Sequence, residues 1–414
     1  MKHLKNSDES LHKLIEEELE RQKSGIEMIA SESFVPMEIM EIQGSILTNK
    51  TMEGFPGRRY HAGHEVIDKI ETLGIERAKE LYGAEHANIQ PHSGSQANQS
   101  VYAALIKPGD TILGMKLDHG GHLTHGSSVN FSGKIYNSVS YGLNSETETI
   151  DYDEIERLAK MHKPKIIIAG ASSYPRFIDY ERISKIAHEA GAYFLVDMAH
   201  VAGLVAAGVH PSPVPFADVV TGTTTKTLAG ARGGFILCKK ELAKKIDSAV
   251  FPGVQGSMHM HIMGAKAFTF KRAGTKEYKE IMEQVVKNSK ALAKELEGFG
   301  FRMVTGGTDN HLLLVDLRPK ALTGKQFDLA LESAGITVNK NMIPNDPEKP
   351  MVTSGVRIGV TAMTIKGAKE EEMAEIAGLM NKVAENIDNK EVIKNVKREA
   401  VEISLRFPLY KGML

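Results

Sequence analysis

The stretch YFLVDMAH at residues 193–200 joins a short apolar run to a carboxylate and, three positions later, to a histidine. Runs of the same apolar or β-branched character occur at residues 165–170, 218–221 and 234–238. Strands that are buried on both faces of a sheet have this near-continuous apolar character. Because helical stretches separate the runs, the sequence between residues 85 and 240 predicts an α/β fold with βαβ units around a mostly parallel sheet.

The residue patterns at the two ends of the chain differ from the α/β pattern between them. Four apolar residues recur at helical spacing near the start: Leu11, Leu14, Ile15 and Leu19. They predict an amphipathic helix that needs a partner surface, which could be another subunit. A long helical stretch is expected to end at Gly298, and a strand-like run at residues 311–317 with a Glu/Lys/Ala-rich tail after Lys366 indicates a smaller α+β domain. A chain of 414 residues also exceeds one ordinary hydrophobic core.

Composition excludes several classes of protein. Lysine and arginine total 51 against 52 aspartate and glutamate, so a generally basic nucleic-acid surface is not expected and a small-molecule partner is favoured. The single cysteine, Cys238, cannot form an intramolecular disulfide. The first 20 residues are charged and no long apolar run occurs, which predicts a cytoplasmic protein with no membrane segment.

Polar residues that directly follow two predicted strands are the first candidates for a site, because ligands of open α/β sheets bind outside the carboxyl ends of the strands. One strand ends in Asp197, with His200 close behind, and another runs into GTTTKT at residues 222–227, which contains Lys226. Taken alone, Asp197 could be explained as the N-cap of a helix, and Lys226 as an ordinary solvated surface lysine. Together they supply what pyridoxal phosphate needs, a lysine for a Schiff base and an acid that keeps the pyridine nitrogen protonated.

The cofactor also needs a phosphate site. The small and hydroxyl residues of SGSQAN at residues 93–98 stand where a helix is expected to start, so backbone N–H groups there would face an anion. Such residues also form ordinary loops, and the segment lacks the Lys-[Ser/Thr] ending of a Walker loop.

Two further motifs have competing interpretations. The histidines of DHGGHLTH at residues 118–125 are spaced by three, but the glycine pair breaks a helix and no acidic or cysteine cluster completes a usual metal site, so no metal is predicted. A flat imidazole stacked on the cofactor ring is the favoured use. Arg357 lies in a Gly-bounded segment suited to a bidentate contact with a carboxylate, although a surface salt bridge would also explain it.

The motifs VDMAHVAGLVAAG at residues 196–208 and KTLAGARGG at residues 226–234 resemble the serine hydroxymethyltransferase family. The resemblance spans nearly the whole chain and includes IASESF at 29–34, EGFPGRRY at 53–60, PHSGSQAN at 91–98, GGHLTHG at 120–126, NKNMIPN at 339–345 and TSGVR at 353–357. It implies the fold-type I architecture of pyridoxal-phosphate transferases, with a large domain built on a mostly parallel seven-stranded sheet and a smaller C-terminal α+β domain. The expected boundaries are an N-terminal interface arm at 1–55, the cofactor-binding domain at 56–280 and the small domain at 281–414.

The resemblance also implies the site residues and the partners. The catalytic residues would be Lys226, Glu53, His122 and Asp197. The cofactor-binding residues would be Gly94, Ser95, His122, Ser172, Asp197, His200, Thr223, Lys226 and Gly256. The substrate-binding residues would be Ser31, His61, Arg357, Arg232, Leu117, Leu123 and Asn341. A homodimer with shared active sites is expected, with serine, glycine and a tetrahydropterin as the small-molecule partners.

In the implied reaction, Lys226 carries pyridoxal phosphate and Asp197 pairs with the ring nitrogen. Serine replaces the lysine, Arg357 holds its carboxylate, and the hydroxymethyl carbon moves to the tetrahydropterin with Glu53 as the proton-transfer residue.

The sequence departs from the family pattern around the cofactor and the interface. Thr225 stands where a histidine usually precedes the lysine, Thr51 and His61 replace tyrosines, and Ser257 replaces the second glycine of a Gln-Gly-Gly turn. These substitutions are expected to affect the affinity for the cofactor and the reaction rate more than the class of reaction. The carrier could be tetrahydrofolate or, as in an archaeal-like member, tetrahydromethanopterin.

Three other functions compete with the transferase. A threonine or allothreonine aldolase or an aminotransferase would use the same Asp197 and Lys226. An aminotransferase would have no obvious use for Glu53 or for residues 339–345, and cleavage of allothreonine could be a side activity of the transferase. A binding protein that has lost the chemistry would not need the acid, lysine and arginine together. A nucleic-acid-binding protein would need a more basic composition.

Overall fold

The computed structural model describes residues 2–410. The chain folds into two compact units. The larger unit is Val35–Glu283, and the smaller unit is Met1–Phe34 together with Gln284–Leu414.

The two units do not follow the chain order of the predicted domains. Residues 1–34 group with the C-terminal part of the chain, whereas residues 35–55 belong to the larger unit. The long helix α12 (Lys276–Gly298) contains the boundary and ends at Gly298 as predicted. The role of residues 1–55 as an interface arm and the boundaries of the other two domains stay predictions.

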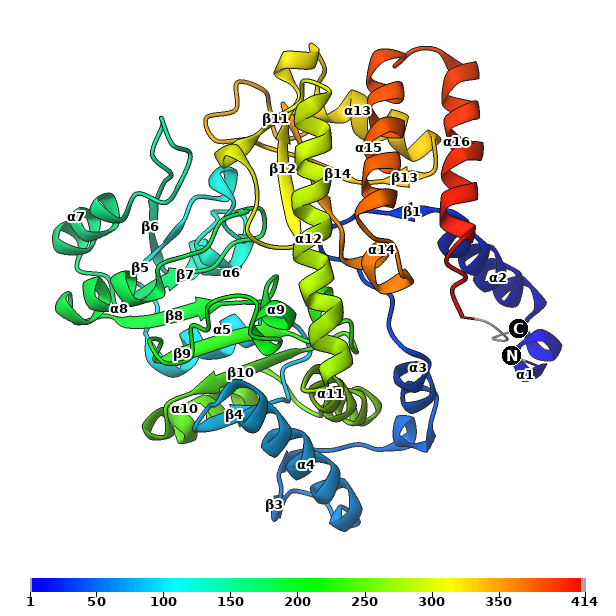
Figure 1. Ribbon diagram of the computed structural model, residues 1–414. Helices are drawn as coiled ribbons and strands as arrows, with labels where there is room; N and C mark the ends of the chain where they lie inside the picture. Colours follow the sequence, from blue (N-terminus) through cyan, green and yellow to red (C-terminus); the bar gives the residue numbers. More distant parts are fainter. Residues whose placement is uncertain (1, 411–414) are drawn as a thin grey trace. The chain divides into compact units, whose positions relative to one another are not determined.

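A seven-stranded sheet forms the framework of the larger unit (Figure 1). Its strands, in spatial order, are β4 (His86–Asn88), β10 (Gly234–Cys238), β9 (Val219–Thr223), β8 (Tyr193–Asp197), β7 (Ile166–Ala169), β5 (Thr111–Met115) and β6 (Asn137–Tyr141). β10 runs antiparallel to both neighbours, and the other adjacent strands are parallel. The predicted α/β fold and its four quoted strands are confirmed.

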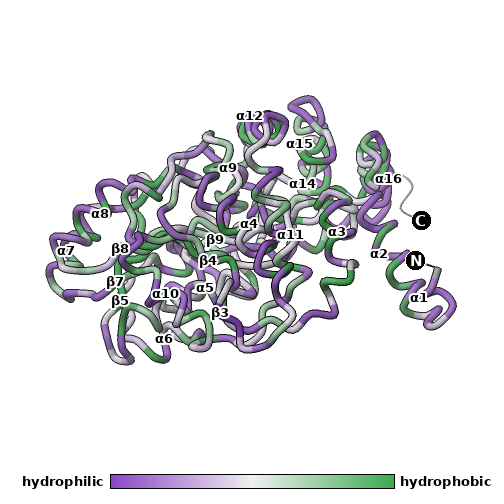
Figure 2. The backbone as a smooth tube through the Cα atoms, turned by 90° about the horizontal axis from the view of Figure 1, so that it is seen from below, coloured by the Kyte–Doolittle hydropathy of each residue, from purple (hydrophilic) through white to green (hydrophobic). Residues whose placement is uncertain are grey.

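Helices pack on this sheet and bury its apolar side chains. α5 (Gly94–Leu105) and α10 (Ala243–Ser248) share one buried cluster with the strands, in which Val101 and Ile246 pack together with sheet residues such as Leu195. Figure 2 shows hydrophobic residues along β7 and β8 and mainly hydrophilic ones along α7 and α8. The other helices are α3 (Met37–Gln43), α4 (Glu65–Tyr82), α6 (Phe131–Ile135), α7 (Tyr152–His162), α8 (Tyr180–Glu189), α9 (Ala202–Ala206) and α11 (Met260–Ala273).

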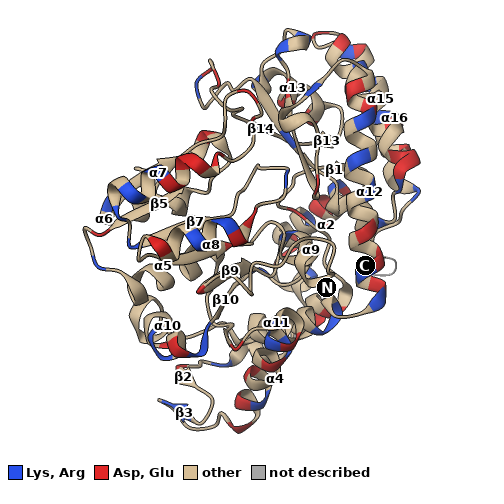
Figure 3. Cartoon of the chain, turned by 60° about the vertical axis from the view of Figure 1, so that its left-hand side comes forward, with Lys and Arg blue, Asp and Glu red and all other residues tan. Residues whose placement is uncertain are grey.

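The smaller unit contains a four-stranded antiparallel sheet. Its spatial order is β11 (Arg302–Met303), β12 (Leu312–Asp316), β15 (Gly355–Gly359) and β14 (Asn339–Asn341). The C-terminal helices are α13 (Gly324–Ser333), α14 (Thr361–Lys366), α15 (Glu370–Glu385) and α16 (Lys390–Leu405). Figure 3 shows charges of both signs interspersed along α15 and α16, as expected for surface helices. The predicted smaller α+β domain is thus confirmed in its secondary structure.

The N-terminal segment begins with α1 (Lys2–Ser7) and α2 (Glu9–Ser24), followed by β1 (Ile26–Glu27), which pairs with β13 (Ile336–Thr337). Within the chain, α2 does not bury all of its predicted apolar stripe. Leu19 is buried, but Leu11 and Ile15 are exposed and Leu14 is 60% exposed.

Among the described residues, no helix combines the length and the apolar character that crossing a bilayer requires.

A fully buried lysine fixes one edge of the large sheet. Lys266 of α11 is 0% exposed, and its Nζ donates to the carbonyls of Ile89 (2.7 Å), Pro91 (2.9 Å) and Gly234 (2.7 Å). Three carbonyl acceptors require three N–H donors, which only the ammonium form of lysine has. These hydrogen bonds therefore oppose the effect of burial, which lowers the pKa of Lys266 to about 7.

We expect Lys266→Met to change how stability depends on pH. The folded pKa of about 7 lies below the ordinary value of 10.5, so the unfolded chain binds more protons between these values. The wild-type free energy of unfolding should therefore rise with pH relative to that of the variant, by at most about 1.4 kcal/mol per pH unit. Urea unfolding between these two pH values measures the difference.

The exposed Lys271 of the same helix provides the control variant, Lys271→Met, whose stability difference from wild type should stay flat with pH. If the difference in free energy of unfolding between Lys266→Met and wild type also did not change with pH, this would contradict the lowered pKa of Lys266.

Candidate active site

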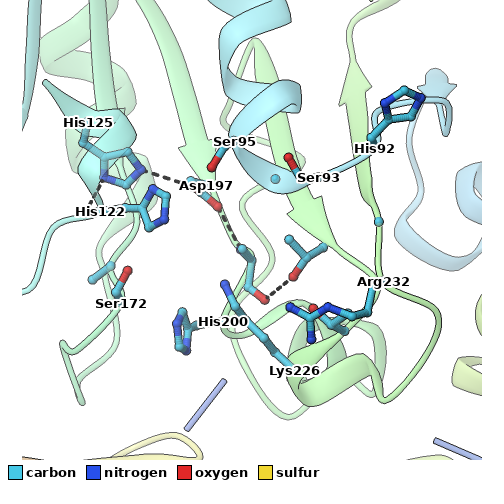
Figure 4. Close-up of a pocket in the computed structure, with 16 residues that line it drawn as sticks. His92, Ser93, Ser95, His122, His125, Ser172, Asp197, His200, Lys226 and Arg232 are labelled. Carbon is cyan, nitrogen blue, oxygen red and sulfur yellow. Dashed lines mark hydrogen bonds and ion pairs between the residues drawn. The ribbon is translucent and has the colours of Figure 1, made fainter. Parts of the chain in front are cut away.

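A pocket of about 210 Å³ lies in the larger unit, at the carboxyl ends of β8 and β9 and the start of α5. Nine of the predicted site residues line it: Gly94, Ser95, His122, Ser172, Asp197, His200, Thr223, Lys226 and Arg232. Figure 4 labels seven of them, and their side chains gather around one space: Ser95, His122, Ser172, Asp197, His200, Lys226 and Arg232. The expectation that chemistry collects at the ends of these strands therefore agrees with the geometry.

The start of α5 forms one wall of the pocket. Ser93 is the N-cap, and its Oγ accepts a hydrogen bond from the N–H of Gln96 at 3.2 Å. A Cβ atom at Gly94 would lie 2.8 Å from Cγ2 of Thr223, so the close approach of helix and strand favours glycine there. The first N–H groups of a helix have no intrahelical acceptors and stand at the positive end of its dipole, so this wall is suited to bind an anion.

Asp197 ends β8 with its side chain only 9% exposed. Its Oδ2 accepts hydrogen bonds from Nδ2 of Asn98 (2.9 Å) and from Nε2 of His125 (3.1 Å), and its Oδ1 accepts one from the N–H of Ala199 (3.0 Å). Burial by itself would raise the pKa of Asp197, but the hydrogen bond from His125 and the electrostatic effect of the nearby His125, His122 and Lys226 side chains hold it below its ordinary value. Asp197 is therefore ionised at neutral pH.

The hydrogen bonds of His125 define which of its ring nitrogens carries a proton. Its Nδ1 accepts from the N–H of His122 at 3.3 Å, so in the neutral ring the proton is on Nε2, which donates to Asp197. His122 itself faces the pocket, and its Nδ1 contacts Oγ1 of Thr124 at 2.7 Å. The two rings come from the N-cap and the last residue of one short turn, with centroids 5.7 Å apart.

The histidines of this turn have an acidic neighbour, which corrects the sequence-based expectation that none accompanies them. One ligand atom each of His122, His125 and Asp197 lies within 4.8 Å of the others. The carboxylate comes from a strand that is distant in the sequence, so the spacing of the histidines could not indicate it. The Nε2–H of His125 already accounts for its short contact with Asp197, so the cluster is explained as a hydrogen-bonded pair.

Lys226 begins a short helical turn after β9, and its backbone φ of 48° lies in the left-handed region. A residue other than glycine adopts this conformation only where its surroundings impose it, and such residues cluster at functional sites. Thr224 and Thr227 fix the turn on either side. Oγ1 of Thr224 donates to the carbonyl of Gly233 at 3.2 Å, and Oγ1 of Thr227 donates to that of His200 at 2.8 Å.

Comparison with known families identifies the family of the chain. The family model described as serine hydroxymethyltransferase matches residues 4–380.

The chain belongs to the serine hydroxymethyltransferase family.

Members of this family are pyridoxal-phosphate-dependent one-carbon transferases of fold type I, and the seven-stranded sheet with a smaller C-terminal unit agrees with that fold.

The pocket fits the cofactor of the serine hydroxymethyltransferase family by the chemistry of its groups. The start of α5 offers N–H and hydroxyl donors to a phosphate, and glycine at position 94 lets this helix start approach Thr223 of β9 closely. The ionised Asp197 can pair with a protonated pyridine nitrogen, and Lys226 can supply an amine to the aldehyde. All three groups line one pocket.

Several predicted site residues lie elsewhere. Glu53, His61, Leu117, Leu123 and Gly256 belong to the larger unit but are not among the lining residues, and Ser31, Asn341 and Arg357 belong to the smaller unit.

Glu53 directly precedes the hairpin β2 (Gly54–Phe55) and β3 (Arg58–Arg59), and a Cβ atom at Gly256 would lie 3.9 Å from its Oε1. The neighbouring Ser257, a departure from the family pattern, accepts a hydrogen bond from the N–H of Met52 through its Oγ at 2.8 Å. The substitution thus ties the glycine turn to the segment that carries Glu53.

Arg357 belongs to the smaller unit. Arg357 lies on β15 opposite Leu314 and Asn339, and its Nε donates to Oδ1 of Asn339 at 3.0 Å. Burial lowers the pKa of Arg357 to about 10. On the same strand, Gly359 would place a Cβ atom 2.3 Å from Cα of Ala30, so glycine lets the segment before Ser31 approach β15 closely.

Sequence reasoning missed the residues that hold Asp197. Asn98 enters the sequence-based prediction only as part of the expected phosphate site at residues 93–98, and His125 only as one of the histidines weighed as metal ligands or as a ring-stacking imidazole. A polar side chain in an amphipathic helix such as α5 gives no sign that it reaches a strand end, so Asn98 could be found only in three dimensions. The sequence feature that could have identified His125 is its place in the GGHLTHG motif at residues 120–126.

We expect His125→Ala to weaken binding of pyridoxal phosphate by about 10- to 100-fold, the worth of one hydrogen bond to a buried charge. Loss of the donor leaves the buried Asp197 less well satisfied and raises its pKa, so it holds a pyridinium less firmly. Titration of the apoprotein with pyridoxal phosphate, followed by absorbance, measures the change.

His125→Gln should restore part of the affinity, because an amide can donate from nearly the same place. The exposed His162 supplies the control, His162→Ala. Equal affinities for wild type and His125→Ala would show that the contact does not support cofactor binding.

Proposed function

We propose that this chain is a serine hydroxymethyltransferase that reversibly transfers the hydroxymethyl carbon of serine to a tetrahydropterin, giving glycine and the methylene-pterin. The observation that carries the proposal is the placement of Asp197 and Lys226 at the ends of adjacent strands in one pocket, in a chain of this family.

Pyridoxal phosphate, when bound, supplies an aldehyde for the amino group and an electron sink for the bond that breaks. In the proposal, Lys226 is the residue to which the aldehyde attaches, and Asp197 keeps the ring nitrogen protonated. Gly94 and Ser95 bind the phosphate at the start of α5, and His122 lies against the ring. Further contacts are assigned to Ser172, His200, Thr223 and Arg232 around the same pocket and to Gly256.

The substrate carboxylate is assigned to Arg357, with Ser31 as a second donor. A guanidinium presents parallel N–H donors that match a carboxylate, and low hydration makes arginine suited to a buried site. Support comes from the burial of Arg357 and from its hydrogen bond with Asn339, which uses Nε and so orients the planar group.

Glu53 is assigned the proton transfer. Its carboxyl group would take the proton of the serine hydroxyl as the carbon leaves and return it during capture by the carrier. The carrier would contact Leu117, Leu123 and Asn341. Both leucines are exposed on the short turns that flank His122, which supports a site for a flat apolar ring system there.

A homodimer with shared active sites is part of the proposal. Glu53, His61 and Gly256 are outside the lining of the pocket, so a second subunit could bring them to it. The exposed Leu11 and Leu14 of α2 give an apolar face that such a partner would cover. We also propose a cytoplasmic location.

Threonine or allothreonine aldolase activity is the second candidate. It needs the acid, the lysine and an imidazole, all of which line the pocket, and it does not need the carrier. The two functions therefore differ in whether a pterin changes the rate.

The experiment that tests the proposal measures conversion of serine to glycine with tetrahydrofolate, with tetrahydromethanopterin and with neither. We expect one pterin to accelerate the reaction strongly, and the preferred one identifies the carrier. Lys226→Ala is the control and should abolish the reaction, because it removes the amine that holds the cofactor. Rates indifferent to both pterins, with cleavage of allothreonine, would replace the proposal by the aldolase.

We expect Glu53→Gln to keep the cofactor and the affinity for serine but to lower the rate of carrier-dependent cleavage by about 100-fold or more, the usual worth of general acid–base catalysis. The amide keeps the size of the side chain and cannot take a proton. Initial rates and cofactor absorbance of the purified variant test this together. Full activity of Glu53→Gln would remove Glu53 from the mechanism.

A further inference from the structure

The hairpin that follows Glu53 is too short to hold itself in place. β2 and β3 have two residues each, and an isolated two-stranded hairpin is at best marginally stable in water. Gly54 has a φ of 91°, and a Cβ atom there would lie 2.3 Å from the carbonyl oxygen of Arg58. Something outside the hairpin must therefore define where Gly54, and with it Glu53, is placed.

The carbonyl group of Gly54 is held by two donors. Nη1 of Arg59 donates to it at 2.7 Å, and Nε2 of Gln90 donates to it at 2.9 Å. Gln90 lies two residues after the end of β4, so one of the two donors comes from the edge of the large sheet. The peptide group between Gly54 and Phe55, one residue beyond Glu53, is thus fixed to the framework of the fold.

A buried carboxylate orients both donors. Glu71 of α4 is 1% exposed, and its Oε1 accepts from Nε2 of Gln90 at 2.7 Å while its Oε2 accepts from Nη2 of Arg59. Asp68, one turn earlier on α4, accepts from Nε of Arg59 at 2.8 Å. The guanidinium therefore has assigned partners at three nitrogens. We refer to Arg59, Gln90 and Glu71 as the Gly54 clamp.

Burying these charges costs free energy that only a complete set of partners offsets. Both members of the Arg59–Glu71 pair are nearly inaccessible, with side chains 4% and 1% exposed. Burial raises the pKa of Glu71, while the charge of Arg59 and the hydrogen bonds from Gln90 and Arg59 oppose the rise. A buried ion pair often adds little net stability, and its better-supported use is to specify one arrangement.

We propose that the Gly54 clamp positions Glu53 for its proton transfer, with Glu71 acting through Arg59 and Gln90 as a positioning residue. The inference rests on the proposed function, in which Glu53 is the proton-transfer residue. Glu71 itself touches neither substrate nor cofactor in this assignment. Its effect should therefore appear in the catalytic rate and only in the presence of a working Glu53.

The test is a double-mutant cycle of Glu53→Gln and Glu71→Gln, measured as carrier-dependent conversion of serine to glycine. Glu71→Gln should lower kcat by about 10- to 100-fold, the range that a small misplacement of a catalytic group costs. The KM for serine and the cofactor absorbance should stay at the wild-type values. In the Glu53→Gln background, Glu71→Gln should cause no further loss, because it acts through the residue already removed.

Glu65 of the same helix is exposed and gives the matched control, Glu65→Gln, which should retain wild-type kinetics. If Glu71→Gln fails to fold, Gln90→Met removes one donor to the Gly54 carbonyl while keeping the Arg59–Glu71 pair. Hydrogen–deuterium exchange of residues 53–60 supplies a readout independent of activity, and exchange should accelerate in either clamp variant.

Three outcomes separate the inference from the proposed function. The inference and the proposed function are both supported if Glu53→Gln loses activity, Glu71→Gln lowers kcat and the double variant shows no further loss. If Glu53→Gln loses activity but Glu71→Gln retains it, or if the two losses are additive in the double variant, only the inference is overturned. Full activity of Glu53→Gln overturns the role of Glu53 and the inference with it.

Discussion

Asn98 contacts three parts of the pocket at once, and the arrangement of the site depends on it. Its Nδ2 donates to Asp197 at 2.9 Å and to Oγ1 of Thr124 at 2.8 Å, and its Oδ1 accepts from Oγ1 of Thr221 at 2.6 Å. One buried amide thereby joins α5, β8, β9 and the turn that carries the two pocket histidines. Because a buried polar group must find its partners, the start of α5 cannot move without disturbing the carboxylate.

Much of the larger unit could be predicted from the sequence because its signals are local. The runs that became β7, β8, β9 and β10 are apolar on both faces, and Ser93 begins α5 where small residues indicated a helix start. The proximity of Asp197 and Lys226 followed from a general property of parallel sheets, since both follow strands that turned out to be neighbours.

What the sequence could not supply depends on contacts between distant residues. The partners of Asp197 come from a helix and a turn about 70 to 100 positions earlier, which no periodicity encodes. The apolar pattern of α2 predicts an amphipathic helix without saying what covers it, and within this chain Leu14 is exposed. The grouping of residues 1–34 with the C-terminal part likewise follows from the pairing of β1 with β13.

The register of β8 against β9 places Asp197 directly opposite Thr221, five positions before Lys226. Backbone hydrogen bonds therefore fix Asp197 against β9, and the side-chain hydrogen bonds of Thr224 and Thr227 fix the turn that carries Lys226 beyond the end of that strand. Other loops that approach the pocket can change in length or composition while these contacts are kept. If the proposed function holds, this scaffold is a suitable starting point for redesigning specificity by exchanging loops that carry none of these contacts.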